Sequence, residues 1–410
     1  MSISDVSRFA LSCCAGVVVL AGCGGGTPLS LSPAGPSTAL RVTSAERTLS
    51  NIRYKVLYSF GASRDAANPY AGLANVKGMF YGTTAYGGAN GDGTVFSITR
   101  SGTETVLYSF KGGPGDGEYP FASLISVKGT LYGTTSQGGA NCSPSGGCGT
   151  VFSITPSGTE TVLHSFGGPG DGNGPLAGLI NVKDKLYGTT MEGGINGDGT
   201  VFSITPSGKE VVRYSFKGGL ADGEFPLAGL VNVKGKFYGT TVYGDANNDG
   251  TVFSITPSGT ETVVYSFKGG SGDGERPYAG VINVEGTLYG TTHLGGANGN
   301  GAVFSVTQSG TETVLYSFKG GSGDGEYPYA GLINVKGMLY GTTIEGGANA
   351  VGTIFSITPS GTETVLHSFG SSGDGQYPYY GGLIYAKGKL YGTTFYGGAY
   401  GNGTVYRLSP

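Results

Sequence analysis

The feature that most constrains the fold of this chain is a unit of about 51 residues that occurs seven times. The second copy is longer than the others because of an insertion at 142–148. Self-similarity at a fixed period of this length is typical of solenoids, propellers and arrays. The marker of the unit, Tyr-Gly-Thr-Thr, begins at Tyr81, Tyr132, Tyr187, Tyr238, Tyr289, Tyr340 and Tyr391.

Each unit predicts four short β-strands. In the fourth copy we expect them at about 227–233, 236–241, 250–256 and 260–267, since these segments are rich in Val, Ile, Leu, Tyr, Phe and Thr. Lys-Gly, a Gly- and Asn-rich segment and Pro-Ser-Gly supply the turns between them. Glycine accounts for 82 of 410 residues. Its recurrence at fixed turn positions indicates order, where an aperiodic sequence of this composition would indicate disorder.

The two ends of the repeat region favour a closed ring over an open stack of sheets. The region begins with a lone fourth-type strand at 53–60 and ends with a third-type strand at 403–409, so each fragment supplies what the other lacks. Ring closure removes exposed strand edges. The sequence therefore predicts an all-β fold over 52–410, a seven-bladed β-propeller with four antiparallel strands per blade, in which the N-terminal strand completes the last blade.

The first strand of each unit is expected to lie innermost, where strands crowd around the axis. Its second residue is small in every copy, which would relieve that crowding. These residues are Gly72, Ser123, Gly178, Gly229, Gly280, Gly331 and Gly381.

Residues 1–22 are expected to form a lipoprotein signal peptide. Arg8 supplies positive charge, and 9–22 is apolar or small but too short to span a bilayer. The sequence ending in Cys23 resembles the lipobox of bacterial lipoproteins, whose cysteine is lipid-modified; an ordinary secretory signal is the alternative. We therefore expect a lipid anchor at Cys23, a flexible linker over 23–51, and a location in a bacterial cell envelope, most simply the outer membrane or cell surface.

Two cysteines bracket the insertion in the second copy. In an exported protein, Cys142 and Cys148 are expected to form a disulfide that pins the enlarged loop. Free thiols are the alternative, and a metal site needs more ligands than this loop offers.

Charged residues are expected to separate between two faces of the propeller. Acidic residues recur in the interblade segments, and lysines recur in the tight turns at the opposite face, so we expect an acidic and a mildly basic face. Each aspartate is expected to cap its own turn; a weak ion site is the alternative, since calcium needs six to eight oxygens. The recurring aspartates are Asp65, Asp116, Asp171, Asp222, Asp273, Asp324 and Asp374.

No catalytic residue, metal or cofactor is predicted. His164 and His367 replace the tyrosine of Tyr-Ser-Phe and are expected to be packed aromatic substitutes, whereas His293 is expected to be an exposed loop residue. No nucleophile motif and no distinctive carboxylate pair occurs, and acid–base catalysis needs groups in distinct environments. The sequence therefore favours a binding protein over an enzyme. A net charge of −3 without a basic stripe argues against nucleic acid as a partner.

The best functional signal is the variation of the two residues that follow each Gly-Thr-Thr. A constant framework with variable loops is how repeat proteins build binding surfaces. The aromatic members could stack on sugar rings or peptide, although drift at solvated positions explains the variation equally well. The candidate ligand-binding residues are Tyr86, Glu192, Tyr243, His293, Glu345, Phe395 and Tyr396.

The motifs VLYSF, GDG, AGLI, LYGTT and GTVFSITPSG, repeated over 52–410, resemble the GloVer tandem-repeat proteins of bacteria. The resemblance implies an exported, envelope-attached protein without an established activity. We expect a monomeric binding or scaffold module for carbohydrate, peptide or an envelope protein, attached to the membrane through its lipid anchor only. The alternatives are a hydrolase or lyase acting on polysaccharide and a purely structural envelope protein.

Overall fold

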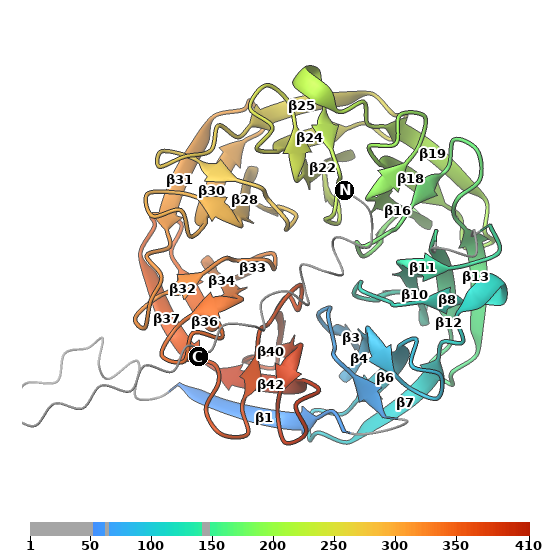
Figure 1. The fold of residues 1–410 in the computed structure, drawn as a ribbon, viewed down its shortest axis with the longest axis horizontal. Helices are drawn as coiled ribbons and strands as arrows, with labels where there is room; N and C mark the ends of the chain where they lie inside the picture. Colours follow the sequence, from blue (N-terminus) through green and yellow to red (C-terminus); the bar gives the residue numbers. More distant parts are fainter. Residues whose placement is uncertain (1–51, 62–64, 142–147) are drawn as a thin grey trace, which may run out of the picture. The chain divides into compact units, whose positions relative to one another are not determined.

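The computed structural model describes residues 52–61, 65–141 and 148–410. These residues form seven four-stranded antiparallel sheets that surround a central axis (Figure 1). The predicted seven-bladed propeller is confirmed. The signal peptide, the linker and Cys23 lie outside the described residues, so those expectations stay predictions. Within the described ranges, no helix has the length and apolar character needed to cross a membrane.

Blade 1 shows how the repeat folds. From the axis outward it contains β3 (Ala74–Val76), β4 (Met79–Thr84), β6 (Thr94–Ile98) and β7 (Glu104–Ser109). Lys77 and Gly78 connect the first two strands with φ angles of 52° and 91°, as a two-residue hairpin turn requires. A Cβ on Gly82 would lie 2.5 Å from the ring of Phe96. The glycine of Tyr-Gly-Thr-Thr therefore makes room for the phenylalanine of the neighbouring strand.

The other six blades repeat this order, again given from the axis outward. Blade 2 contains β9 (Ile125–Val127), β10 (Thr130–Thr135), β12 (Thr150–Ile154) and β13 (Glu160–Ser165); blade 3 contains β15 (Ile180–Val182), β16 (Lys185–Thr190), β18 (Thr200–Ile204) and β19 (Glu210–Ser215); blade 4 contains β21 (Val231–Val233), β22 (Lys236–Thr241), β24 (Thr251–Ile255) and β25 (Glu261–Ser266). Blade 5 contains β27 (Ile282–Val284), β28 (Thr287–Thr292), β30 (Ala302–Thr307) and β31 (Glu312–Ser317); blade 6 contains β33 (Ile333–Val335), β34 (Met338–Thr343), β36 (Thr353–Ile357) and β37 (Glu363–Ser368); blade 7 contains β39 (Ile384–Ala386), β40 (Lys389–Thr394), β42 (Thr404–Ser409) and β1 (Arg53–Ser59).

A two-residue ribbon accompanies each blade on the face that carries the interblade segments. It pairs a piece of the interblade segment with the residues that follow Gly-Thr-Thr, and two short 3₁₀ turns, η1 (Gly113–Gly115) and η2 (Gly219–Ala221), precede two of the ribbons. The pairs are β2 (Ala66–Ala67) with β5 (Tyr86–Gly87), β8 (Gly117–Glu118) with β11 (Gln137–Gly138), β14 (Gly172–Asn173) with β17 (Glu192–Gly193), β20 (Gly223–Glu224) with β23 (Tyr243–Gly244), β26 (Gly274–Glu275) with β29 (Leu294–Gly295), β32 (Gly325–Glu326) with β35 (Glu345–Gly346), and β38 (Gly375–Gln376) with β41 (Tyr396–Gly397).

The ring is closed by the first and last strands of the described chain. β1 pairs antiparallel with β42, from Arg53 opposite Ser409 to Ser59 opposite Thr404. Figure 1 shows β1 on the outer edge of the blade that contains β40 and β42. The predicted closure by the N-terminal strand is therefore confirmed.

Neighbouring blades pack through one aromatic pair at each junction. The phenylalanine that ends an outer strand meets the aromatic residue of the next blade's third strand, as Phe60 meets Phe96 with ring centroids 5.2 Å apart. Edge-on pairs of this kind contribute about 0.5–1.5 kcal/mol beyond burial. The remaining pairs are Phe110–Phe152, Phe166–Phe202, Phe216–Phe253, Phe267–Phe304, Phe318–Phe355 and Phe369–Tyr406.

The innermost position of the first strands is confirmed by the sheet order and by contacts between first strands of neighbouring blades. A Cβ on Gly280 would lie 2.6 Å from the carbonyl oxygen of Gly229 in the preceding blade. In blade 7 the residue that faces the neighbouring blade is Gly382 and not the expected Gly381, because this copy carries one extra residue, at Tyr379-Tyr380. A Cβ on Gly72 would lie 2.4 Å from the Gly382 carbonyl oxygen.

The expected acidic face is wrong for the recurring aspartates. Five of the seven are buried, with 3–6% of their surface exposed, and Asp65 and Asp171 are half-buried. Each caps its own turn, as predicted: Asp324 accepts backbone hydrogen bonds from Lys319 and Gly325 at 2.8 and 2.7 Å. The lysines of the tight turns at the other face are exposed.

Candidate functional site

A cavity of about 140 Å³ lies on the axis of the ring, where the interblade segments enter the first strands. Equivalent positions of blades 2 to 6 build most of its wall: the residue after the recurring proline, then a small residue and a glycine or serine. Blades 1 and 7 add Ala71 and Tyr380. Phe121, Tyr278, Tyr329 and Tyr380 give part of the wall an aromatic surface, whereas blades 3 and 4 contribute leucines. A concave site with apolar walls and a few polar groups is typical of ligand-binding pockets.

Five aromatic residues form a continuous cluster along this wall, which we call the aromatic cluster. Tyr70 lies edge-on to Phe121 with centroids 4.7 Å apart and contacts Tyr380 at 5.1 Å. Tyr380 reaches Tyr329 at 5.5 Å, and Tyr329 stacks on Tyr278 at 4.6 Å. The cluster therefore connects blades 1 and 2 to blades 5 and 6 through the extra residue of blade 7.

The phenol groups of this cluster stay protonated at any physiological pH. Burial, with a smaller contribution from neighbouring phenols, raises the pKa of Tyr278 to about 12. The same causes raise the pKa values of Tyr70, Tyr329 and Tyr380 well above that of free tyrosine. Each hydroxyl can thus both donate and accept a hydrogen bond beside an apolar ring face.

The sequence-predicted residues Phe395, Tyr396 and Tyr86 lie near the Tyr70 end of this cluster. Phe395 is buried and contacts Tyr70 at 5.7 Å, with Tyr396 edge-on to it at 4.6 Å. Tyr86 is 36% exposed and lies 6.4 Å from Phe395. The two residues after Gly-Thr-Thr therefore occupy different environments. The first points inward in every blade, and the second lies on the ribbon at the surface.

His293 is not the exposed loop residue that the sequence suggested. It is half-buried between Tyr278, Tyr329 and Tyr327, with ring centroids 4.5–5.1 Å away. Burial, assisted by the nearby Arg276, lowers the pKa of His293 to about 3. His293 is therefore a neutral ring that packs behind the aromatic cluster.

The remaining candidates lie on ribbons of separate blades. The Arg276 guanidinium lies 5.3 Å from the Tyr243 ring centroid, in the range of a cation–π contact. Glu192 accepts a long contact of 3.4 Å from Asn173. Glu345 is directly opposite Glu326, and burial together with that like charge raises the pKa of Glu345. Of these three residues, Tyr243 also interacts with Tyr278 of the aromatic cluster.

The residue after the proline of each interblade segment is a candidate position that the sequence interpretation missed. It is aromatic in five of seven copies, namely Tyr70, Phe121, Tyr278, Tyr329 and Tyr379, and leucine in the other two. That bias was visible in the repeat. Only the fold shows that the position faces the axis, because the segment looks like a polar loop in the sequence.

A second recurring polar arrangement lies at the outer rim, at the junctions between blades. The tyrosine or histidine near the end of each outer strand donates to or shares a hydrogen bond with the aspartate of the following segment, as Tyr316 does with Asp324 at 2.7 Å. At six junctions, the glutamate that begins the next outer strand lies beside this pair. We call these arrangements the junction triads.

Each junction glutamate is held in an unfavourable environment for its charge. Burial and the neighbouring aspartate raise the pKa of all six to about 7, and one carboxylate oxygen of each is buried with no hydrogen-bond partner among the described residues. The six glutamates are Glu104, Glu160, Glu210, Glu261, Glu312 and Glu363. Tyr54 takes this place at the seventh junction, where it stacks on His367 at 3.7 Å.

The histidines of two triads are packed aromatic substitutes, as expected. His164 and His367 lie edge-on to the following phenylalanines at 4.8 and 5.1 Å. Each also bonds to the aspartate of its junction at 2.9 Å. The proposed Cys142–Cys148 disulfide stays a prediction, because Cys142 lies outside the described residues.

The structure defines a seven-bladed β-propeller with a pocket on its axis. The repeat model described as the Gloeobacter/Verrucomicrobia repeat matches residues 38–146, 143–274 and 269–410. The chain therefore belongs to this repeat family, which confirms the resemblance drawn from its motifs. None of the curated proteins matches the chain.

Solved structures share the general architecture at low similarity. A luciferin-regenerating enzyme is 12% identical, with a TM-score of 0.41 over 84% of this chain and 92% of that protein. A puromycin-hydrolyzing peptidase of Mycobacterium tuberculosis is 9% identical (TM-score 0.47; 86% and 50% covered), so this chain spans half of its length. PorZ, a surface component of the type-IX secretion system of Porphyromonas gingivalis, is 16% identical (TM-score 0.43; 78% and 44% covered).

Proposed function

We propose that this propeller is a carbohydrate-binding module of the bacterial cell envelope that holds a sugar unit at the aromatic cluster. The observation that carries the proposal is the row of ring faces and protonated phenols along the axial cavity. Sugar rings present apolar C–H faces and hydroxyl groups together, which matches side chains with an apolar body and a polar tip. A peptide or an envelope protein is the alternative ligand.

The size of the cavity supports a terminal or protruding sugar unit as the bound group. Its volume of about 140 Å³ is small beside the ~300–1,000 Å³ of pockets that enclose whole drug-sized ligands. The remainder of a glycan would lie across the ribbon residues Tyr86 and Tyr396 at the surface. Attachment to a membrane through Cys23 would keep the propeller close to envelope polysaccharide.

The experiment is a glycan array probed with the purified full-length protein, followed by calorimetry on the best glycan. The informative variant is Tyr278→Leu combined with Tyr329→Leu, because blades 3 and 4 already carry leucine at this position and fold. We expect at least a tenfold loss of affinity, since stacking on two rings is removed. Tyr400→Ala is the matched control, because Tyr400 is 65% exposed and lies outside the cluster.

Two results would contradict the proposal. One is an array without any bound glycan, with a peptide or protein captured instead. The other is a bound glycan whose affinity the double leucine variant leaves unchanged.

A further inference from the structure

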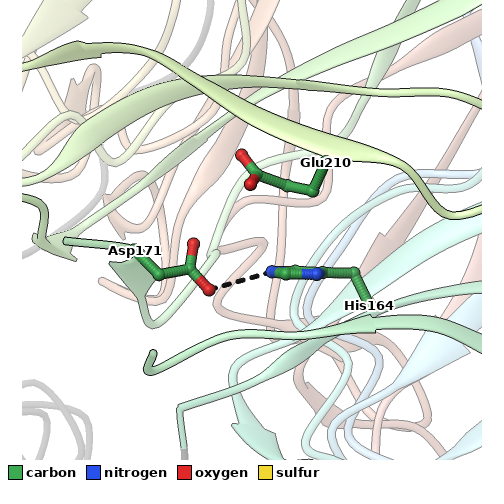
Figure 2. Close-up of side chains that lie close together, drawn as sticks. All are labelled: His164, Asp171 and Glu210. Carbon is green, nitrogen blue, oxygen red and sulfur yellow. Dashed lines mark hydrogen bonds and ion pairs between the residues drawn. The ribbon is translucent and has the colours of Figure 1, made fainter. Parts of the chain in front are cut away.

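The junction between blades 2 and 3 brings a histidine together with two carboxylates. His164 comes from the outer strand of blade 2, Asp171 from the segment that follows it, and Glu210 from the outer strand of blade 3. Figure 2 shows the His164 and Glu210 side chains pointing toward Asp171. One ligand atom of each lies within 4.8 Å of the other two.

This junction differs from the other six in a way that matters for metal binding. Five junctions carry tyrosine where His164 stands, and a protonated phenol is a poor metal ligand. The seventh has His367 and Asp374, but Tyr54 replaces the glutamate and stacks on the imidazole. Only the 2–3 junction, among the described residues, combines an imidazole with two carboxylates.

Like the other five junction glutamates, Glu210 offers a carboxylate oxygen that no donor among the described residues occupies, and only here does a histidine face it. Its Oε1 atom is buried and accepts no hydrogen bond from any described group. Asp171 lies beside it, and the Nε of Arg213 is directed to the hydroxyl of Ser203 at 2.8 Å. Buried carboxylate oxygens without a donor are costly unless a proton or a cation satisfies them.

We propose that His164, Asp171 and Glu210 bind a divalent transition-metal ion, for which zinc is the best match. Zinc takes histidine nitrogen and carboxylate oxygen as ligands, and a water would complete its tetrahedral shell. Calcium is a poorer match because it requires six to eight oxygens. The ion would bind blade 2 to blade 3, since its ligands come from both.

The geometry requires only small side-chain movements to reach such a site. Zinc with bonds of about 2.0–2.2 Å places its ligand atoms roughly 3.4 Å apart. The His164 Nε2 to Asp171 Oδ2 distance of 2.9 Å would lengthen by about half an ångström. Because the ligand atoms lie within 4.8 Å of one another, Glu210 would move inward by at most roughly 1.4 Å, as a rotation of its side chain allows.

The test uses the metal-free full-length protein titrated with zinc chloride at pH 7.5, with calorimetry and thermal melting. His164→Tyr is the key variant, because it installs the residue that five other junctions carry and therefore preserves the fold. His367→Tyr is the matched control at the junction that lacks glutamate. Any zinc that the cysteines bind is the same in the wild type and in both variants, so it does not change the difference in zinc binding between them.

We expect the wild type and His367→Tyr to bind one more zinc than His164→Tyr, with a higher melting temperature in zinc. Glu210→Gln should weaken this site at least tenfold. Crystals grown with zinc should show an anomalous scattering peak beside His164. Equal binding by His164→Tyr and wild type, unchanged affinity in Glu210→Gln, or no peak beside His164 would each overturn the proposal.

Discussion

The junction triads should make the propeller less stable at neutral pH than at mildly acidic pH, and Glu363 is the residue with which to measure this. Glu363 begins the outer strand β37 and lies beside Asp324, the aspartate of the preceding junction. Burial, followed by the Asp324 charge, raises the pKa of Glu363 from 4.5 to about 7, although Lys319 partly opposes the shift. The folded protein therefore binds this proton more tightly than the unfolded chain does.

The sign follows from that difference. The protonated carboxyl favours the folded state fully below pH 4.5, and the advantage is lost as the pH rises through 7. A difference of this size corresponds to about 3 kcal/mol for a fully buried group. Glu363 is only half-buried, so solvent screening reduces our expectation to about 1 kcal/mol.

The assay is urea unfolding of wild type and Glu363→Gln, followed by far-ultraviolet circular dichroism because the chain has no tryptophan. Glutamine cannot ionise, so the variant should be about 1 kcal/mol more stable than wild type at pH 8 and equal to it at pH 4.5. Glu285→Gln, at an exposed turn, is the control and should show no difference at either pH. A variant that is no more stable than wild type at pH 8, or a difference independent of pH, would refute the reasoning.

Two further predictions compare nearly identical positions of different blades. Gly280→Ala should lower the free energy of unfolding by about 1–3 kcal/mol, because its Cβ would lie 2.6 Å from a backbone oxygen. Gly331→Ala should be nearly neutral, because the equivalent oxygen lies 3.7 Å away. Equal effects of the two substitutions in chemical denaturation would contradict the crowding argument. Thr240→Val should cost about 1 kcal/mol, because its hydroxyl donates to the next blade at 2.9 Å. Thr342→Val should be neutral or stabilising, because that buried hydroxyl has no partner within the described ranges; a loss as large as that of Thr240→Val would show that the interblade bond is not the cause.

The fold could be predicted because its determinants are local and recur. The Lys77-Gly78 turn, the alternating strand pattern and the unpaired strand at 53–60 are each visible within a few residues of sequence. Ring closure then followed from matching the two ends. The crowding of the inner strands could also be predicted, from the small residue that recurs in each copy. The exception is blade 7, where the extra residue places Gly382, and not Gly381, against the neighbouring blade.

The chemistry of the faces was harder to predict, because residue type does not determine side-chain direction. Asp324 was expected at an acidic surface, yet it turns inward to the hydroxyl of Tyr316, eight residues earlier. Glu363 follows a tight turn and has the sequence pattern of a solvated residue. It is half-buried because the outer strand of one blade ends where that of the next begins, which is a tertiary property of the ring.

The ligand-binding residues expected from the sequence and the aromatic cluster lie on the same face, in neighbouring loops. The variable residues after Gly-Thr-Thr include Phe395 and Tyr86, which border the aromatic cluster, and His293, which supports it from behind. The cluster itself comes from the position after the proline and from the extra Tyr380. A single inserted residue carries no periodic signal, so its role in joining the two parts of the cluster emerges only from the coordinates.

The stacked pair of Tyr54 and His367 distinguishes the strand that closes the ring from the six other outer strands. The strand at 53–59 is similar in sequence to the outer strands of the six other blades. Backbone hydrogen bonding alone would therefore allow it to pair with any three-stranded blade, including one in another molecule. Elsewhere a glutamate occupies the Tyr54 position, and five of the six other partners are tyrosines. Only at the closing junction, among the described residues, does an aromatic ring at the Tyr54 position meet an imidazole, because the other junction histidine, His164, faces Glu210. Closure of the ring by the strand at 53–59 is therefore favoured by a contact that the other six junctions do not offer.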